Sequence, residues 1–313
     1  MHPFLSRQGL FPLRSRLAPT PSGLLHVGNG VNCVLTWLVV RHHGGSLRLR
    51  IDDVDCARSR PAYVEDIFRQ LDWLGLDWDE GPQGPGEFFT RFSQRLKRER
   101  YLALRDELVR RELLYCCTCS RRHIRDQVND GLYPGTCRGR RTPPAEAHAW
   151  RVRLPQDSRI RVGAQEVDVS RAMGDFVVWR RDGLPAYQLA SLADDIDDRI
   201  TLVVRGEDLL PSTAAQLLLA AQLEERGFLA AEFLHHPLLS CPQGNKLSKS
   251  HGALSLAAMR ISGAGPAVVY RETARLLGLP PECGDSLTDL QAAAFPPRVC
   301  APVPESCLCA GTS

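Results

Sequence analysis

The chain of 313 residues is too long for a single small module and long enough for one large α/β domain, or for two ordinary domains with proper cores. Its formal net charge is only +3, so the composition alone does not indicate a nucleic-acid-binding protein. The best apolar run, over residues 31–40, is short and interrupted by polar residues, which excludes a membrane-embedded protein.

The N-terminal segment lacks the continuous apolar region and the small-residue cleavage site of a signal peptide. Eleven cysteines would suit a disulfide framework in a short secreted chain, but four of them crowd one segment: Cys116, Cys117, Cys119 and Cys137. Because no signal peptide is recognised, we expect a cytoplasmic protein. In a cytoplasmic chain such a cluster indicates a metal site.

The first part of the chain predicts alternating strands and helices. A short strand ending at residues 16–18 precedes a turn rich in proline and glycine, and an apolar helix is expected over 28–40. Residues 46–51 alternate like a strand, and residues 64–74 have the spacing of an amphipathic helix. Strand, helix, strand, helix is the pattern of a parallel sheet, so we expect an α/β fold.

The second part continues with short strands predicted at 152–154, 176–179 and 200–204, followed by a long helix over 212–225. These elements suggest a second βαβ half. Beyond about Pro280 the chain is rich in Pro, Ala, Ser and Cys with little periodicity, and we expect a loosely structured tail there.

The turn between the first strand and the first helix is the first candidate site. Residues 16–29 read Arg-Leu-Ala-Pro-Thr-Pro-Ser-Gly-Leu-Leu-His-Val-Gly-Asn. Backbone N–H groups and the positive end of the following helix attract an anion, His26 supplies a donor, and Gly28 lets a ligand approach the backbone. This is the outline of a nucleotide-phosphate site. The alternative is an ordinary strand-to-helix turn with a surface histidine.

The whole string closely resembles the HIGH signature of class I aminoacyl-tRNA synthetases, in the form used by the glutamyl branch. Residues 245–250, Asn-Lys-Leu-Ser-Lys-Ser, resemble the KMSKS loop of the same class, and they contain two of only three lysines in the chain. Two compact ammonium groups on one loop suit a triphosphate. The resemblance implies a Rossmann-type, doubly wound parallel sheet and catalytic roles for His26, Lys246 and Lys249. It also implies ATP binding by His26, Gly28, Asn29, Lys246 and Lys249.

Residues 50–55, Arg-Ile-Asp-Asp-Val-Asp, follow the second strand, where acidic side chains can hold a substrate amino group. Glutamyl synthetases carry glutamate at the position of Asp52, so here the contact is either lost or bridged by water. The segments around Tyr187 and Arg205 resemble family segments that meet the substrate, and guanidinium groups are natural readers of carboxylates. The resemblance implies an L-glutamate site formed by Arg16, Leu17, Ala18, Pro19, Thr20, Asp52, Tyr187 and Arg205.

The cysteine cluster has the order Cys117-x-Cys119, then 13 residues, then Tyr133-Pro-Gly-Thr-Cys137. Three thiolates and one more donor make a zinc ligand set, and the alternative is ordinary reduced thiols. The order resembles the zinc element of bacterial glutamyl-queuosine tRNA(Asp) synthetases, which implies one Zn²⁺ per chain with Tyr133 as the fourth ligand. Cys116 or His123 could take its place. Residues 91–141 carry 14 basic and 6 acidic side chains, so we expect the arginine-rich flanks to contact tRNA phosphates.

The resemblance divides the chain into an N-terminal extension (1–13), a catalytic domain (14–255) with a zinc-bearing insertion at about 115–141, and a helical remnant with the tail (256–313). No anticodon-binding domain is expected. The implied function is tRNA-independent activation of L-glutamate by ATP with Mg²⁺, and transfer of glutamate to the queuosine of tRNA(Asp). Alternatives are a truncated synthetase charging the 3′ end of tRNA(Glu), and a non-catalytic tRNA-binding relative. We expect a monomer.

Overall fold

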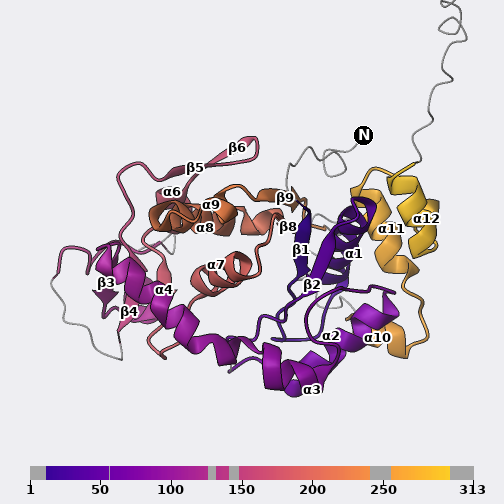
Figure 1. Ribbon diagram of the computed structural model, residues 1–313, viewed down its shortest axis with the longest axis horizontal. Coiled ribbons are helices and arrows are strands. Elements are labelled where there is room, and N and C mark those ends of the chain that lie inside the picture. The colour runs from indigo at the N-terminus through magenta and orange to yellow at the C-terminus, as the bar shows by residue number, and fades with distance from the viewer. Residues whose placement is uncertain (1–11, 56, 126–131, 141–147, 240–254, 297–313) are drawn as a thin grey trace, which may run out of the picture.

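The computed structural model describes residues 12–55, 57–125, 132–140, 148–239 and 255–296, and only the backbone of Arg121 and Arg125. The first half contains β1 (Arg14–Leu17), α1 (Val27–His42), β2 (Ser46–Leu49), α2 (Pro61–Trp73), α3 (Pro85–Glu87), α4 (Arg98–Arg110), β3 (Leu114–Cys117) and α5 (Arg121–Arg125) (Figure 1). The second half contains β4 (Ala149–Val152), β5 (Arg159–Val162), β6 (Gln165–Asp168), α6 (Val169–Met173), β7 (Val177–Trp179), α7 (Tyr187–Asp197), β8 (Leu202–Gly206), α8 (Leu210–Leu223), α9 (Arg226–Leu229), β9 (Glu232–His236), α10 (Leu256–Ile261), α11 (Ala267–Leu276) and α12 (Leu287–Ala294). No described helix has both the length and the apolar character needed to cross a bilayer.

Parallel strands form the layer that positions the site. β1 pairs with β2 in parallel, and β8 pairs with β9 in parallel. β1 also lies against β8, because the backbone N–H of Thr201 donates to the carbonyl of Arg14 at 2.9 Å and the hydroxyl of Ser15 donates to the carbonyl of Leu202 at 2.8 Å. The units β1-α1-β2 and β8-α8-β9 are therefore neighbours, which confirms the α/β fold with parallel strands.

α1 is the central helix of the first hydrophobic core. Ten of its 16 residues are buried, and they lie on nearly all sides of the helix. It packs against β1, β2 and β8 and is covered by α11, as Figure 1 shows on the right of the molecule. A helix that is apolar all round is stable only in such a buried place.

Two of the expected strands do not belong to the parallel layer. β4 and β7, close to the runs predicted at 152–154 and 176–179, join β3 in a three-stranded antiparallel sheet, and the hairpin β5–β6 lies between them in sequence. Our expectation that these runs belong to a second βαβ half was therefore wrong. Their pattern identifies them as strands, but only the partner strand decides the sheet, and β3 lies next to β4.

The chain beyond Pro280 is also more ordered than expected. α12 begins after Ser286, whose hydroxyl accepts a hydrogen bond from the backbone N–H of Asp289 at 3.0 Å. It buries Leu290 and Ala294 in the first core. Eight residues are too few for a visible helical period, which is why the sequence suggested loose structure. Residues 297–313 of the expected tail lie outside the described residues.

Candidate active site

A cavity of about 540 Å³ opens between the turn after β1, the N-terminus of α1 and the carboxyl end of β8. We call it the first cavity. Open α/β sheets bind ligands at this edge. The residues predicted from the sequence that line it are Ala18, Pro19, Thr20, His26, Gly28, Asn29, Tyr187 and Arg205. Its lining also includes Asn32, Asp208 and His236, which the sequence did not suggest.

His26 stands at the N-cap position of α1. Its backbone N–H donates to Oδ1 of Asn29 at 3.0 Å, which fixes the first turn of the helix. Burial lowers the pKa of the His26 imidazole, so the ring is neutral at pH 7 and donates one N–H. A Cβ on Gly28 would lie 3.0 Å from the ring, so a larger residue here would push the imidazole by a few tenths of an ångström. The histidine is therefore held as a neutral donor at the anion-binding end of α1.

The two predicted lysines, Lys246 and Lys249, lie outside the described residues. The described residues on either side of their segment do lie at the first cavity. Leu239 lines the cavity, and Ser255 forms an antiparallel bridge with His26. The described residues that flank the segment therefore lie beside the turn over residues 16–29. The catalytic roles of the two lysines stay predictions.

Arg205 brings a buried positive charge to the first cavity. Its side chain is only 3 % exposed, and its Nη1 donates to Oε1 of Gln216 at 3.0 Å. Its Nε and Nη2 have no hydrogen-bond partner among the described residues. Burial lowers the pKa of this guanidinium, although Tyr187 and Asp195 act against this. A buried guanidinium with unused N–H groups suits a carboxylate ligand.

The predicted glutamate-binding residues Arg16 and Leu17 directly precede the turn that lines the first cavity. Both are buried in β1, and neither is among the described residues that line the cavities. Nε of Arg16 donates to Oδ1 of Asp195 at 3.0 Å, so this guanidinium is engaged inside the protein. The structure brings Arg205 and Tyr187 together at the first cavity, whereas Arg16 is bound to Asp195. A direct contact of Arg16 with substrate stays a prediction.

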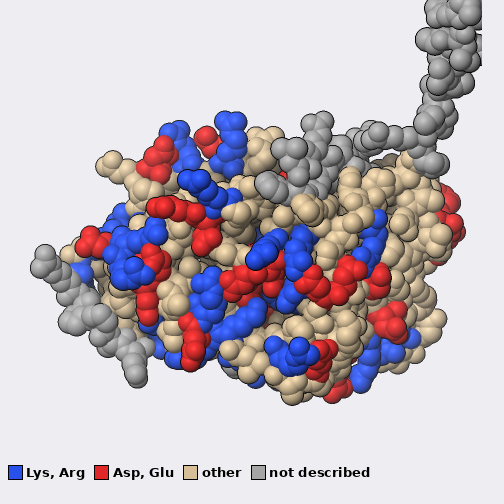
Figure 2. Space-filling view, viewed as in Figure 1, with Lys and Arg blue, Asp and Glu red and all other residues tan. Residues whose placement is uncertain are grey.

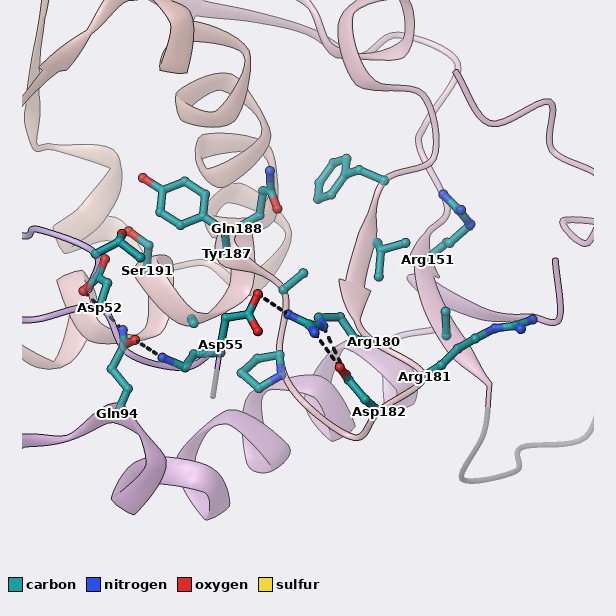
Figure 3. Close-up of a pocket in the computed structure, with 18 of the residues that line it drawn as sticks. Asp52, Asp55, Gln94, Arg151, Arg180, Arg181, Asp182, Tyr187, Gln188 and Ser191 are labelled. Atoms are coloured by element: carbon teal, nitrogen blue, oxygen red, sulfur yellow. Dashed lines mark hydrogen bonds and ion pairs between the residues drawn. The ribbon is translucent and has the colours of Figure 1, made fainter. Parts of the chain in front are cut away.

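A second cavity of about 710 Å³ also has Tyr187 in its lining (Figure 3). Tyr187 and Thr20 line both cavities, so the two spaces are neighbours. In Figure 3, Asp52 and Gln94 lie at one end of the second cavity and Arg151 at the other. Asp52 thus faces the second cavity and not the first.

Asp52 is held by neighbours in the protein. Its Oδ1 accepts from Nε of Arg50 at 2.7 Å and from Nε2 of Gln94 at 3.3 Å. Burial raises the pKa of the Asp52 carboxyl, although Arg50 acts against this. The shorter side chain at this position is therefore already satisfied by Arg50 and Gln94, and Gln94 was missed in the sequence.

Two buried acids on α7 were also missed. Tyr187, Ser191, Asp194 and Asp195 have the spacing of one helix face, and the two aspartates are at most 1 % exposed. Asp195 accepts from Nη1 of Arg50 at 2.6 Å in addition to Arg16. The sequence did contain a signal for them, because both acids lie in a largely apolar helix at helical spacing from Tyr187. Buried carboxylates need partners, so such acids indicate a buried polar network.

Asp194 serves a separate group of donors. It accepts from Nε2 of Gln94 at 2.6 Å and from Nζ of Lys97 at 2.9 Å. The hydroxyl of Tyr101 also lies 3.1 Å from both of its oxygens. Asp194 is therefore part of a buried network of charged and polar side chains that reaches the second cavity through Gln94.

The cysteine cluster comes together as predicted. The sulfur atoms of Cys117, Cys119 and Cys137 all lie within 4.8 Å of one another. The hydroxyl of Tyr133 lies 3.4 Å from the sulfur of Cys117 and 3.7 Å from that of Cys119. Tetrahedral zinc with bonds of about 2.3 Å to sulfur places its sulfur ligands about 3.8 Å apart. The residues present therefore fit a zinc ion.

The proposed substitutes for Tyr133 are not in this group. Cys116 and Cys117 are adjacent in β3, so their side chains point to opposite faces of the sheet. Neither Cys116 nor His123 belongs to the thiol group found among the described residues. Although burial acts to raise it, hydrogen bonds from Tyr133, Thr118 and Cys119 bring the pKa of the Cys137 thiol down to about 6. The geometry favours Tyr133 as the fourth donor.

Charge is more evenly spread in space than along the sequence. On the face shown in Figure 2, basic and acidic side chains are interspersed. Arg100 pairs with Asp197 at 2.7 Å and Lys97 pairs with Asp194 at 2.9 Å, and both acids lie outside residues 91–141. The positive excess of this segment is partly neutralised in this way, and contact of the arginine-rich flanks with tRNA stays a prediction.

Comparison with known proteins gives a consistent result. Residues 12–294 match the family model for the catalytic domain of class I tRNA synthetases (E and Q). A glutamyl-Q tRNA(Asp) synthetase from Symbiobacterium thermophilum is 42% identical over 291 residues, covering 85% of this chain and 87% of the relative. A glutamate–tRNA ligase from Anaeromyxobacter sp. is 38% identical over 277 residues, covering 84% of this chain but only 57% of the ligase.

A solved structure shows the same fold. The crystal structure of a glutamate tRNA ligase from Elizabethkingia meningosepticum, in complex with its amino acid, matches with a TM-score of 0.67 at 24% identity. The match covers 90% of this chain and 64% of the solved chain. This chain therefore spans somewhat less than two thirds of the length of that ligase.

Proposed function

Because the chain belongs to the family of class I glutamyl- and glutaminyl-tRNA synthetase catalytic domains, we propose that it activates L-glutamate with ATP and transfers it to the queuosine of tRNA(Asp). The observation that carries the activation step is Arg205, a buried guanidinium with unpartnered N–H groups beside the signature turn. The choice of acceptor rests on the glutamyl-Q relatives, of whose length this chain covers the greater part.

In the activation step, ATP with Mg²⁺ would occupy the first cavity at the N-terminus of α1. Arg205 would bind the side-chain carboxylate of glutamate, with Tyr187 beside it. An oxygen of the α-carboxylate attacks the α-phosphorus, the bond to the bridging oxygen breaks, and pyrophosphate leaves. Neutral His26 would donate to the phosphates, and Lys246 and Lys249 would stabilise the charge that builds on pyrophosphate. Catalysis then consists of positioning and charge stabilisation.

In the transfer step, the acceptor nucleoside would enter the second cavity, which shares Tyr187 and Thr20 with the first. A hydroxyl of the acceptor attacks the acyl carbon of the adenylate, AMP leaves, and the hydroxyl proton passes to the departing phosphate. A neighbouring cavity allows this without moving the glutamate. The arrangement supports an acceptor approaching from the side of the cysteine cluster.

The cluster would hold one zinc ion through Cys117, Cys119, Cys137 and Tyr133. With four protein ligands such a site is closed, so the ion would supply folding energy and no chemistry on the substrate. Cys119 and its neighbour Ser120 also line the second cavity. The ion would thereby support one wall of the acceptor cavity.

The test measures glutamate-dependent ATP–pyrophosphate exchange without tRNA, followed by transfer of labelled glutamate. The acceptors are tRNA(Asp) with queuosine, tRNA(Asp) without it, and tRNA(Glu). We expect exchange without tRNA, and label only on the queuosine-containing tRNA(Asp), where it should survive removal of the 3′-terminal adenosine. Label on tRNA(Glu) would instead identify a truncated glutamyl-tRNA synthetase. Absence of exchange, together with no label on any of the three tRNAs, would leave a tRNA-binding protein without catalysis.

A further inference from the structure

Arg205 is oriented by a helix that has no other part in the site described above. β8 and β9 pair in register with Arg205 opposite His235, so these two side chains point to the same face of the parallel layer. α8 presents Thr213 and Gln216, which are one turn apart, to that face. The hydroxyl of Thr213 lies 2.8 Å from Nε2 of His235, and Oε1 of Gln216 accepts from Nη1 of Arg205 at 3.0 Å.

Neither neighbour of Arg205 on this face brings a charge. Gln216 is a fully buried amide. Burial, followed by the charge of Arg205, lowers the pKa of His235 to about 4, so its ring is neutral at pH 7. Asp195 is the carboxylate that acts on Arg205, but it is already hydrogen-bonded by Arg16 and Arg50. The charge of Arg205 is thus left for a ligand.

Gln216 binds Arg205 without neutralising it, but one of its own hydrogen-bond donors stays unsatisfied. Its Nε2 has no hydrogen-bond partner among the described residues, although the side chain is completely buried. An unsatisfied buried donor is destabilising, and a glutamate of the same length would remove it and neutralise Arg205 as well. Stability alone therefore favours a carboxylate at position 216, and the amide needs another reason.

We propose that Gln216 is a positioning residue that selects for an anionic amino-acid side chain, because its amide oxygen orients Arg205 without neutralising it. This inference rests on the proposed activation of glutamate. A carboxylate at position 216 would compete with the substrate carboxylate for the same guanidinium. An apolar residue of the same length would leave the charge but release the orientation.

The test uses Gln216→Glu, Gln216→Met and, as a control, Gln165→Glu at an exposed position of β6. The KM and kcat for glutamate and for glutamine are measured by ATP–pyrophosphate exchange, and the shift of Tm on addition of L-glutamate is measured by calorimetry. For Gln216→Glu we expect a Tm no lower than wild type and a KM for glutamate raised roughly tenfold or more, with a similar fall in the preference for glutamate over glutamine. Gln216→Met should raise KM less and keep the preference. Gln165→Glu should behave as wild type.

Three results overturn the proposal. One is an unchanged KM and preference in Gln216→Glu. Another is an equal loss in Gln216→Glu and Gln216→Met with a lowered Tm, which is the outcome of a purely structural role. If wild type shows no exchange but is stabilised by glutamate, the proposed function fails while the Tm shifts of the variants still test Gln216. The third is a wild type that shows no exchange and is not stabilised by glutamate, in which case the proposed function and the role of Gln216 both fail.

Discussion

Asp195 is the residue on which the buried charges below the site depend. Two guanidinium groups share one of its oxygens, Arg16 at 3.0 Å and Arg50 at 2.6 Å, and all three side chains are at most 5 % exposed. Buried charges are tolerated only when they are paired, so removal of one partner costs far more than the pair contributes. Asp195 on α7 therefore holds the guanidinium groups of Arg16 in β1 and of Arg50 after β2 in place.

Asp195→Asn should destabilise the protein by about 3–5 kcal/mol, because it leaves the buried Arg16 without its ion-pair partner and removes one of the counter-charges of Arg50. Urea unfolding at pH 7 measures this. The control is Asp285→Asn, which breaks the exposed pair with Arg271 and should change stability by at most about 1 kcal/mol. If the two substitutions lower the free energy of unfolding equally, the buried pair contributes no more to stability than the exposed pair.

The same comparison has a defined dependence on pH. Burial acts to raise the pKa of Asp195, but Arg16, Arg50 and Arg205 together hold it below its ordinary value. A carboxyl with a lowered pKa in the folded state contributes stability above its unfolded pKa and loses it as the pH falls through the folded pKa. The difference between wild type and Asp195→Asn should therefore be full at pH 7 and shrink below about pH 4.

At the scale of elements, the sequence pattern predicted the helices and strands that depend on residues close together in the chain. The units β1-α1-β2 and α2 were predicted because their apolar spacing is long and regular, and α8 was predicted for the same reason. The sheet of β3, β4 and β7 could not be predicted, because pairing of β4 with β3 joins residues far apart in sequence. Burial of Leu290 in α12 depends likewise on α11 beside it.

The candidate site divides in a similar way. Residues in one signature turn, such as His26 and Gly28, lie at the first cavity because a single strand-to-helix connection carries them. Gln94 and Asp194 escaped because they meet only in three dimensions, 100 positions apart. Asp52 was correctly singled out, but its partner Gln94 and its place at the second cavity required the fold.

Cys117→Ser should remove the metal from the cysteine cluster. Wild type should hold about one zinc per chain, since three thiols and Tyr133 converge, and the variant should hold much less. Elemental analysis after dialysis measures this, with Cys283→Ser as a control because Cys283 lies outside the group of converging thiols. Retention of zinc by Cys117→Ser, or its absence from wild type, would remove the cluster as a zinc site.

On the scale of the whole molecule, the two cavities lie where two parts of the protein meet. The first core contains β1, β2, α1 and α11, and the second contains α4, α7, α8 and the antiparallel sheet. Arg180, directly after β7, crosses between them to Asp55 in the loop after β2 at 3.2 Å, and it also pairs with Asp182 (Figure 3). All three residues line the second cavity, and none of them lines the first.

This arrangement allows activation and transfer to be separated by one substitution. Arg180→Met should lower transfer of glutamate to tRNA roughly tenfold, because a small displacement of one wall of the second cavity misplaces the acceptor. ATP–pyrophosphate exchange should stay close to wild type, since the first cavity is lined by other residues. The control is Arg159→Met on the β5–β6 hairpin, which breaks an exposed pair with Asp157 and should affect neither step. If exchange falls together with transfer in Arg180→Met, the two cavities act as one site. The assignment of activation to the first cavity and of transfer to the second would then be wrong.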